Sequence, residues 1–374
     1  MIRSTIAHID VNALADNFRT IAAYLTDCRS GVPPPIVVAV VKANAYGHGA
    51  ARVALELERA GATMVACADI EEAVTLRAAG LSAGILVFGA LSLSDLEGVF
   101  EHNLTPTVST PTAGRSLQAA AARHGRRVRY HLKIDTGMNR LGFRHDNLGR
   151  TMPGLLACRN LELEGVYTHF ATADTPGHPL FAEQKRRFAA VVAQLASMGE
   201  RPRLLHAANS AAMLSDPTTW FDMVRPGLVL YGVTPPALPA TLRLKPVMSL
   251  RSRIVAVKGV RPGEQVGYGA RFDASRPTTI AVIPAGYADG LDVRLAGRGA
   301  VLVRGRRAPI IGAVCMDMLM ADVTGSEVQP GDEAVFIGQQ GDQEIDVAEM
   351  AEVIGTIPYE VLCRVGTRIE RIYI

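Results

Sequence analysis

Short apolar runs alternate with longer helix-like segments over about the first 230 residues, and this alternation limits the possible folds more than any other feature. Candidate strands span 36–41, 63–67, 85–89, 105–109, 128–134, 163–170, 203–208 and 222–226. Helical periodicity covers 50–60, 70–79, 112–123 and 179–198. The runs are too apolar to have one solvent-exposed face, as expected for parallel strands covered by helices on both faces of the sheet. Eight such strands predict an α/β fold with a closed (β/α)8 barrel, which usually takes about 250 residues.

The pattern changes after about residue 240. Short strand-like runs at 252–260, 278–290, 308–314, 318–323 and 332–338 are separated by glycine- and proline-containing turns. Helix-length periodicity is nearly absent there, which predicts a mostly antiparallel β domain. We therefore expect a barrel domain over 1–240 and a β domain over 241–374, joined by the proline-containing segment 230–245, with the first residues a candidate for pairing with the β domain.

Charge and cysteine usage exclude several classes of protein. The net charge is +3, and the arginine groups within 123–129 and 304–307 are separate and lack interleaved aromatic residues. Solvated faces explain them better than a nucleic-acid groove does. Five scattered cysteines without a C-x-x-C favour a reducing compartment. The N-terminus lacks a signal-peptide core, and no run approaches the ~20 apolar residues of a membrane helix. We expect a cytoplasmic protein.

Polar residues follow several of the predicted strands. The chemistry of a β/α barrel lies at the carboxyl ends of its strands, and these positions hold Lys42, Lys133, Asp135, His169, Asn209, Ser210 and Arg225. Lys42 follows an entirely apolar predicted strand, I-V-V-A-V-V. It either extends its amine to water along its alkyl stem or is desolvated, with a lowered pKa that makes it a nucleophile for a carbonyl.

Pyridoxal phosphate (PLP) is the commonest carbonyl cofactor held by such a lysine, and it needs a phosphate cradle and a partner for its ring nitrogen. Ser210 opens a short helix whose first amides can bind an anion. Gly227 permits close backbone approach, and Arg225 supplies a fixed cation. Dinucleotide and P-loop fingerprints are absent. The nine histidines form no metal-ligand spacing, so we expect no protein-bound metal.

Eight segments in order resemble those of alanine racemase. They are V-V-K-A-N-A-Y-G-H-G, L-K-I-D-T-G-M-N-R-L-G-F, T-H-F, N-S-A-A, V-R-P-G, V-G-Y-G-A, G-Y-A-D-G and C-M-D-M, and they extend from about residue 36 towards the C-terminus. The resemblance implies a PLP-bearing barrel followed by a β domain. It also implies a homodimer with active sites shared across the interface, and alanine as the substrate, with D-alanine either made for cell-wall precursors or degraded.

The resemblance also implies roles for single residues. Lys42 matches the lysine that bonds to PLP, Tyr46 a phosphate contact, and Arg225 the arginine that faces the ring nitrogen. Because an arginine keeps its proton, the pyridine would stay largely unprotonated, which disfavours transamination. The other positions matched to cofactor contacts are His169, Asn209, Ser210, Gly227, Leu228 and Tyr359.

Racemisation removes the α-proton from one face of a planar centre and returns it on the other, so two bases must flank that centre. Lys42 can serve one face. Tyr268 resembles the family's second base, contributed by the other subunit. A free phenol has a pKa of about 10 and needs cationic neighbours to act near neutrality. Arg140 and His169 match the residues that supply them.

The remaining matched positions concern the substrate and its entrance. Arg140 and Met316 resemble substrate contacts, and Lys133 matches a position often carbamylated in the family. Tyr287 and Asp174 resemble entrance residues. The family usually ends near Arg-Val-Pro-Arg, where this chain has Thr-Arg-Ile-Glu-Arg (367–371). The departure concerns the packing of the last strand and touches none of the residues assigned to catalysis.

Two alternatives remain open from the residues. A barrel-type PLP amino-acid decarboxylase needs no second base, so the Gly-Tyr-Gly at 267–269 argues against it. A non-catalytic PLP-binding protein would resemble the barrel alone and would lack a β domain. We therefore favour a PLP-dependent isomerase that racemises alanine by a two-base, lysine and tyrosine, mechanism.

Overall fold

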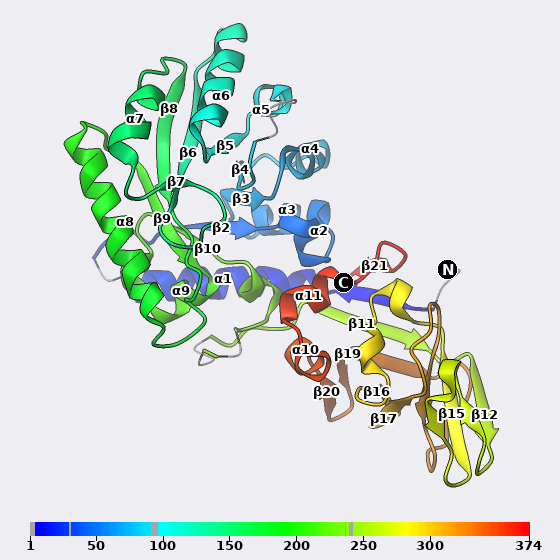
Figure 1. Cartoon of the computed structure of the whole chain (residues 1–374). Helices are drawn as coiled ribbons and strands as arrows, with labels where there is room; N and C mark the ends of the chain where they lie inside the picture. The colour runs from blue at the N-terminus through cyan, green and yellow to red at the C-terminus, as the bar shows by residue number, and fades with distance from the viewer. Residues whose placement is uncertain (1–3, 30, 92–95, 236, 239–241) are drawn as a thin grey trace.

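The computed structural model describes residues 4–29, 31–91, 96–235, 237–238 and 242–374. Eight parallel strands form the first domain (Figure 1). They are β2 (Ile36–Val40), β3 (Met64–Cys67), β4 (Gly84–Val87), β5 (Thr105–Val108), β6 (Val128–Asp135), β8 (Leu161–Tyr167), β9 (Leu204–Asn209) and β10 (Met223–Arg225). Strand β5 pairs with β6 and so closes the sheet into a barrel. The predicted (β/α)8 barrel is confirmed.

Helices follow the strands around the barrel. The structure contains α1 (Val11–Asp27), α2 (Lys42–Tyr46), α3 (Ala50–Arg59), α4 (Ile70–Ala78), α5 (Glu97–Glu101), α6 (Pro111–Arg123), α7 (Leu148–Leu156), α8 (Pro179–Ser197) and α9 (Ser210–Ser215). Side chains cap several of their first turns: Asp69 accepts from Glu72 N in α4 and Thr110 accepts from Ala113 N in α6. Helix α1 was not expected from the sequence.

The rest of the domain consists of the short strand β7 (Phe143–Arg144) and two 3-10 turns, η1 (Pro217–Thr219) and η2 (Leu228–Tyr231). No helix in the described part of the chain is long and apolar enough to cross a membrane.

A ten-stranded sheet forms the second domain, and its order is β12-β15-β18-β17-β16-β19-β11-β1-β21, with β20 paired to β19. Its strands are β1 (Ile6–Ile9), β11 (Met248–Arg253), β12 (Ala256–Val260), β15 (Thr278–Ile283), β16 (Ala300–Val303), β17 (Arg306–Ile311), β18 (Leu319–Asp322), β19 (Glu333–Gln340), β20 (Gln343–Ile345) and β21 (Glu370–Tyr373). All pairings except β1 with β21 are antiparallel. The predicted, mostly antiparallel β domain is confirmed.

Smaller elements complete the β domain. They are the hairpin of β13 (Gln265–Val266) and β14 (Phe272–Asp273), the turns η3 (Tyr268–Ala270), η4 (Tyr287–Asp289) and η5 (Val293–Leu295), and the helices α10 (Val347–Ile354) and α11 (Pro358–Cys363). The two helices depart from the expected near-absence of helical structure. Asp346 caps α10, and Gly355 ends it with a left-handed φ of 67°.

The two ends of the chain meet in this sheet. Strand β1 lies between β11 and β21, with Ile6 opposite Arg251 on one side and Glu370 on the other. The chain therefore starts in the β domain, forms the barrel and returns. The expected boundary between residues 240 and 241 lies outside the described residues.

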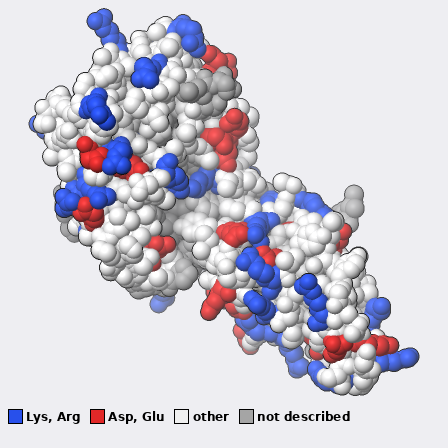
Figure 2. All heavy atoms as spheres, viewed as in Figure 1, with Lys and Arg blue, Asp and Glu red and all other residues white. Residues whose placement is uncertain are grey.

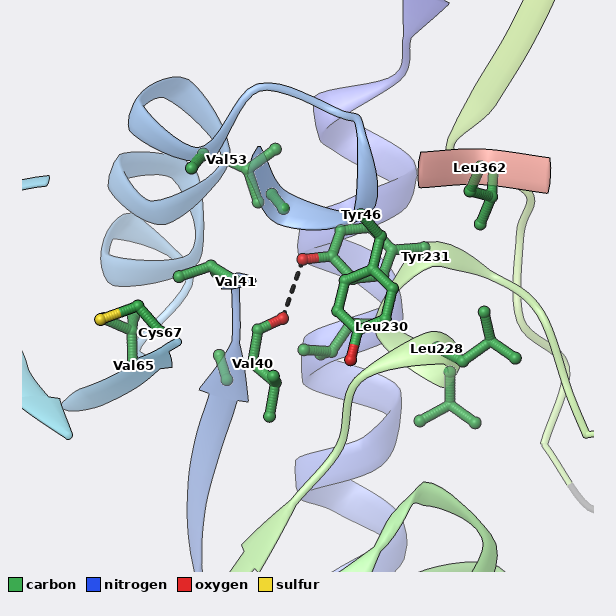
Figure 3. Close-up of a cluster of buried hydrophobic side chains, with 14 of the residues drawn as sticks. Val40, Val41, Tyr46, Val53, Val65, Cys67, Leu228, Leu230, Tyr231 and Leu362 are labelled. Carbon is green, nitrogen blue, oxygen red and sulfur yellow. Dashed lines mark hydrogen bonds between the residues drawn. The ribbon is translucent and has the colours of Figure 1, made fainter. Parts of the chain in front are cut away.

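The barrel and the β domain share a hydrophobic cluster near the end of β2 (Figure 3). Leu362 from α11 lies beside Tyr46 and Tyr231 of the barrel in that view, and Tyr231 donates a hydrogen bond to Val40 O at 2.9 Å. Figure 2 shows the two lobes joined at a narrow waist, with acidic and basic side chains intermixed on the visible face. The position of Leu362 beside Tyr46 and Tyr231 shows that α11 reaches the carboxyl end of the barrel.

Candidate active site

A cavity of about 660 Å³ opens at the carboxyl end of the barrel strands. The candidate residues that line it are Lys42, Tyr46, Lys133, Arg140, His169, Asp174, Asn209, Ser210, Arg225, Gly227, Leu228 and Tyr359. They come from the ends of several barrel strands, from the turns and helices that follow those strands, and from α11. Parallel strands that end at one rim bring such distant residues together.

The chain makes an unusual turn directly after Lys42. Ala43, Asn44, Ala45 and Tyr46 all have φ between 52° and 54°, so four consecutive non-glycine residues adopt left-handed helical backbone. This conformation costs roughly 1–2 kcal/mol per residue. Such strain persists only where the surroundings determine it, and it is common at functional sites.

Several contacts hold this left-handed turn. Glu72 accepts from Ala43 N at 2.7 Å, and Asn44 Oδ1 accepts from Ala50 N at 2.8 Å. The last strand also contributes, because Arg371 Nε donates to Gly47 O at 3.0 Å. Arg371 ends the atypical segment 367–371, so that segment helps to restrain the turn through Gly47, which is not among the residues assigned to catalysis.

Burial lowers the pKa of Lys42, and the positive charge of Arg140 lowers it further. Burial also holds the pKa of Lys133 well below its usual range, with Arg225 as the next cause. Lys133 Nζ lies 4.3 Å from the centre of the Tyr167 ring. Both amines are therefore more readily neutral, and more nucleophilic, than a lysine in water.

The side chain of Arg225 is almost completely buried, and both of its Nη atoms donate hydrogen bonds. Its Nη1 donates to His206 Nδ1 at 2.8 Å, and its Nη2 donates to Thr168 O and Ala207 O at 2.8 and 2.9 Å. His169 Nδ1 lies 3.3 Å from the same Nη2. Burial lowers the pKa of Arg225 to about 10, so the guanidinium keeps its proton at neutral pH.

Ser210, Gly227 and Tyr46 lie close together in the wall of the cavity. Ser210 Oγ accepts from Gly227 N at 2.9 Å, and Asn209 caps α9 by accepting from Ala212 N at 2.9 Å. A Cβ on Gly227 would lie 2.4 Å from the hydroxyl oxygen of Tyr46. The ring of Tyr46 in turn packs on those of Tyr231 and Tyr359, with centroids 4.9 and 5.8 Å apart.

The structure does not bring three of the candidate residues into this cavity. Tyr268, Tyr287 and Met316 line a second, wider hollow of about 1520 Å³ on the β domain. Their exposed fractions are 77%, 45% and 52%. Within one chain, the two groups of residues therefore lie on different domains.

Two residues that organise the site were not predicted from the sequence, His206 and Glu72. His206, on β9, contacts Arg225 directly, and its only sequence signal is a histidine inside an apolar strand, L-L-H-A-A. Glu72 supports the turn after Lys42 from the first turn of α4, and the sequence offers no signal for that contact.

The charge of the cavity suits PLP. Four of the lining residues are basic, Lys42, Lys133, Arg140 and Arg225, and among the described lining residues Asp174 is the single carboxylate. A dianionic phosphate and a substrate carboxylate are compensated in such a site. Within the described ranges, no group of three or more His, Cys, Asp or Glu side chains could hold a metal ion.

Comparison with known proteins agrees with this geometry. Residues 9–235 match the family model "Alanine racemase, N-terminal domain", and 247–373 match "Alanine racemase, C-terminal domain". The alanine racemase of Symbiobacterium thermophilum is 41% identical over 374 residues, covering 100% of this chain and 97% of that protein.

Solved structures give the same result. Alanine racemase from a D-cycloserine-producing Streptomyces lavendulae superimposes with a TM-score of 0.94 at 36% identity, covering 100% of this chain and 98% of that one. Alanine racemase from Bartonella henselae, solved with covalently bound pyridoxal phosphate, has a TM-score of 0.89 at 31% identity, covering 99% of each chain. Both domains and the full length agree, and the chain belongs to the alanine racemase family.

Proposed function

We propose that this protein is a PLP-dependent isomerase that interconverts L-alanine and D-alanine. The observation that carries the proposal is the position of Lys42, whose desolvated amine lies at the barrel rim in a cavity lined by basic residues. Membership of the alanine racemase family over both domains supports the choice of alanine. The decarboxylase and carrier alternatives have no such support.

The residues of the cavity fit PLP in distinct roles. Lys42 Nζ would hold the cofactor covalently, and Arg225 would donate to the pyridine nitrogen. The phosphate would lie between Tyr46, Ser210 and the backbone at Gly227 and Leu228. The other cofactor contacts that we assign are His169, Asn209 and Tyr359. Bound PLP supplies the electron sink that acidifies the α-C–H bond of the amino acid.

Two side chains would then move the α-proton. Lys42 Nζ, with its lowered pKa, takes or returns it on one face. Tyr268 Oη serves the other face and comes from a second subunit. The exposure of Tyr268, Met316 and Tyr287 in an open hollow of the β domain supports a homodimer in which this hollow covers the partner's cavity.

The remaining residues would bind and orient the substrate. Arg140 meets its carboxylate, Met316 of the partner subunit limits the side-chain space, and Tyr287 and Asp174 flank the entrance. Lys133 would be carbamylated and would orient Arg140. Carbamylation requires a neutral amine, and the burial that lowers the pKa of Lys133 supplies one.

The proposal is tested by incubating the purified protein with L-alanine in deuterated water. Loss of optical rotation together with deuterium at Cα is the expected result. Release of carbon dioxide would instead identify a decarboxylase, and no reaction a carrier. Sedimentation should give roughly twice the mass of the 39.9 kDa chain, as for a cyclic dimer. A cytoplasmic location is proposed from the five scattered cysteines, which form no C-x-x-C and suit a reducing compartment.

Replacing Arg225 with glutamate should increase transamination by about tenfold, which corresponds to roughly 1.4 kcal/mol on one barrier. A carboxyl group can donate a proton to the pyridine nitrogen, whereas arginine leaves that nitrogen largely unprotonated. Pyruvate released from alanine is measured with a coupled dehydrogenase. The control is Arg225→Lys, which keeps the cation, and a glutamate variant that releases no more pyruvate than the control contradicts the assignment.

Replacing Gly227 with alanine should weaken PLP binding by roughly 10- to 100-fold, because overpacking costs about 1–3 kcal/mol. The new Cβ would lie 2.4 Å from the Tyr46 hydroxyl oxygen, and the packed Tyr46 ring cannot move away easily. Equilibrium dialysis of the cofactor-free protein measures the affinity. Gly154→Ala is the control, since nothing lies within 4 Å of its Cβ. An unchanged PLP affinity in the Gly227→Ala variant would show that the backbone at Gly227 is not part of the phosphate site.

A further inference from the structure

His48 is a buried, titratable side chain that the proposed mechanism does not use. It follows the left-handed turn of residues 43–46, and none of its surface is exposed. Its Nδ1 lies 2.9 Å from Ala45 O and 2.9 Å from Tyr46 O. The imidazole therefore reaches back to the last two residues of the turn that follows Lys42.

The two carbonyls determine which nitrogen of His48 carries the proton. A carbonyl oxygen only accepts hydrogen bonds, so Nδ1 must be the protonated nitrogen of the ring. Burial lowers the pKa of His48 to about 4, so the ring is neutral at neutral pH and Nε2 carries no proton. A single N–H is thus shared between Ala45 O and Tyr46 O.

The carbonyl of Tyr46 depends on this N–H. The backbone N–H groups of residues 47–49 donate to the carbonyls of residues 43–45 at 2.9–3.0 Å. No backbone N–H of the described residues donates to Tyr46 O. Without the imidazole this carbonyl would lose its hydrogen bond, and a buried carbonyl left unpaired disfavours the conformation that buries it.

The other ring nitrogen indicates that packing alone does not explain the imidazole. His48 Nε2 has no hydrogen-bond partner among the described residues. Leaving a buried acceptor unpaired is unfavourable, and an apolar ring would fill the same space without that penalty. The donor at Nδ1 is the property of histidine that offsets it.

Contacts fix both the ring and the backbone of His48. The ring centroid lies 4.5 Å from that of Tyr231, and the Tyr46 ring lies 4.9 Å from the same tyrosine. Tyr231 in turn donates to Val40 O, at the end of β2 (Figure 3). The backbone is held as well, because Tyr373 Oη donates to His48 O at 3.3 Å. The imidazole therefore has a defined position from which to hold the turn.

We propose that His48 is a positioning residue for the cofactor site: its Nδ1–H holds the last two carbonyls of the left-handed turn and so keeps Lys42 and Tyr46 in the cavity. Without that N–H, residues 43–46 should relax towards right-handed or extended backbone, because left-handed backbone persists only where the surroundings determine it. Lys42, next to the turn, and Tyr46, its last residue, would then leave their positions at the rim. This role rests on the proposed function, because it assigns both residues to PLP.

The position of the proton on His48 is measured directly, by nitrogen NMR of the holoenzyme labelled with ¹⁵N-histidine. We expect one proton on the ring, at Nδ1, and the signal is assigned as the one that is absent from His48→Asn. This measurement does not depend on turnover. A proton at Nε2 in the unaltered protein overturns the proposal, whatever the variants do.

Two variants separate the donor from the ring. His48→Asn keeps an N–H donor at the place of Nδ1 and removes the ring, whereas His48→Phe keeps an aromatic ring beside Tyr231 and removes the donor. We expect His48→Phe to weaken PLP binding roughly tenfold or more, the effect of leaving a buried carbonyl unpaired, and His48→Asn to stay within about threefold. Equilibrium dialysis of the cofactor-free protein measures both affinities. His124→Phe is the control and should leave the affinity unchanged, since its ring stacks on Phe100, 4.2 Å away, at the end of α6.

Hydrogen exchange reports on the turn itself. In the cofactor-free protein, the peptide that covers residues 42–49 should exchange its amides at least about fivefold faster in His48→Phe than in the unaltered protein, because the turn opens more often. The same peptide of His48→Asn should exchange at the unaltered rate. Faster exchange spread evenly over the whole barrel would show a merely structural role and would overturn the proposal.

An unchanged PLP affinity in His48→Phe overturns the proposal. So does a loss in His48→Asn as large as that in His48→Phe, because the ring would then be the property that matters. If His48→Phe does not fold, His48→Asn decides: an affinity within about threefold and unchanged exchange at 42–49 support the role of the donor, and a loss of about tenfold contradicts it. Failure of the unaltered protein to racemise alanine overturns the proposed function, whereas the proton position and the exchange at 42–49 still decide what His48 does for the turn.

Discussion

Racemisation of alanine should fall by about 10⁴-fold or more when Lys42 is replaced by alanine, the loss typical of removing a covalent catalytic group. Lys42 has two proposed roles, as the covalent anchor of PLP and as the base on one face of the substrate. Its burial in the cavity and its lowered pKa serve both roles. The rate is measured by polarimetry, and the visible absorbance of the purified protein reports whether the covalent bond to the cofactor is present.

The control for Lys42→Ala is Lys245→Ala. Lys245 is a surface lysine paired with Asp16, with 64% of its side chain exposed. We expect that variant to keep both the absorbance and the rate. If Lys42→Ala also keeps its colour and turnover, another amine holds the cofactor. Lys133, the other lysine that lines the cavity, would then be the first to test.

Replacing Tyr268 with phenylalanine should lower kcat/KM by about 10²- to 10⁴-fold, the contribution of a general base or acid. The fall must be equal in both directions, because L- and D-alanine have the same free energy and their equilibrium constant is one. Exchange of the α-proton with deuterated water should nevertheless persist for one enantiomer, the one whose proton faces Lys42. Proton NMR of Cα–H follows this exchange, and Tyr24→Phe, on α1 against Trp220, is the control.

A mixture of the two inactive variants tests whether Tyr268 acts across subunits. In a dimer of one Lys42→Ala chain and one Tyr268→Phe chain, one site has both bases and the other has neither. Random reassociation should therefore recover about a quarter of the unaltered activity, given a two-fold symmetric dimer. Equal loss of α-proton exchange for both enantiomers, or no recovery on mixing, would contradict the assignment.

The barrel was predictable because its strands and helices differ in hydrophobic period, and that signal survives in the sequence alone. Helix α1 was missed for a specific reason. The N-terminal segment was considered only as a possible signal peptide, and the cap of the helix, Asp10, which accepts from Ala13 N at 2.8 Å, was not recognised. Helix α10 has eight residues between an aspartate cap and a glycine, too short for its periodicity to stand out among turns.

The candidate site was predictable to the extent that strand ends define it. Lys42, Ser210 and Arg225 lie at one rim because parallel strands end together, so their proximity followed from the fold. Contacts between strands through the barrel interior, such as His206 with His131, depend on register and on a bulge, which the sequence does not reveal. The separation of Tyr268 from the cavity likewise depends on how the two domains are placed.

The left-handed turn after Lys42 has a consequence for building chimeras from related proteins. Four strained residues carry about 4–8 kcal/mol of unfavourable backbone conformation. The end of the chain supplies part of what restrains them, since Arg371 donates to Gly47 O and Tyr373 to His48 O. A chimera that joins this barrel to the β domain of a related protein will therefore keep Lys42 in its position only if it also retains β21.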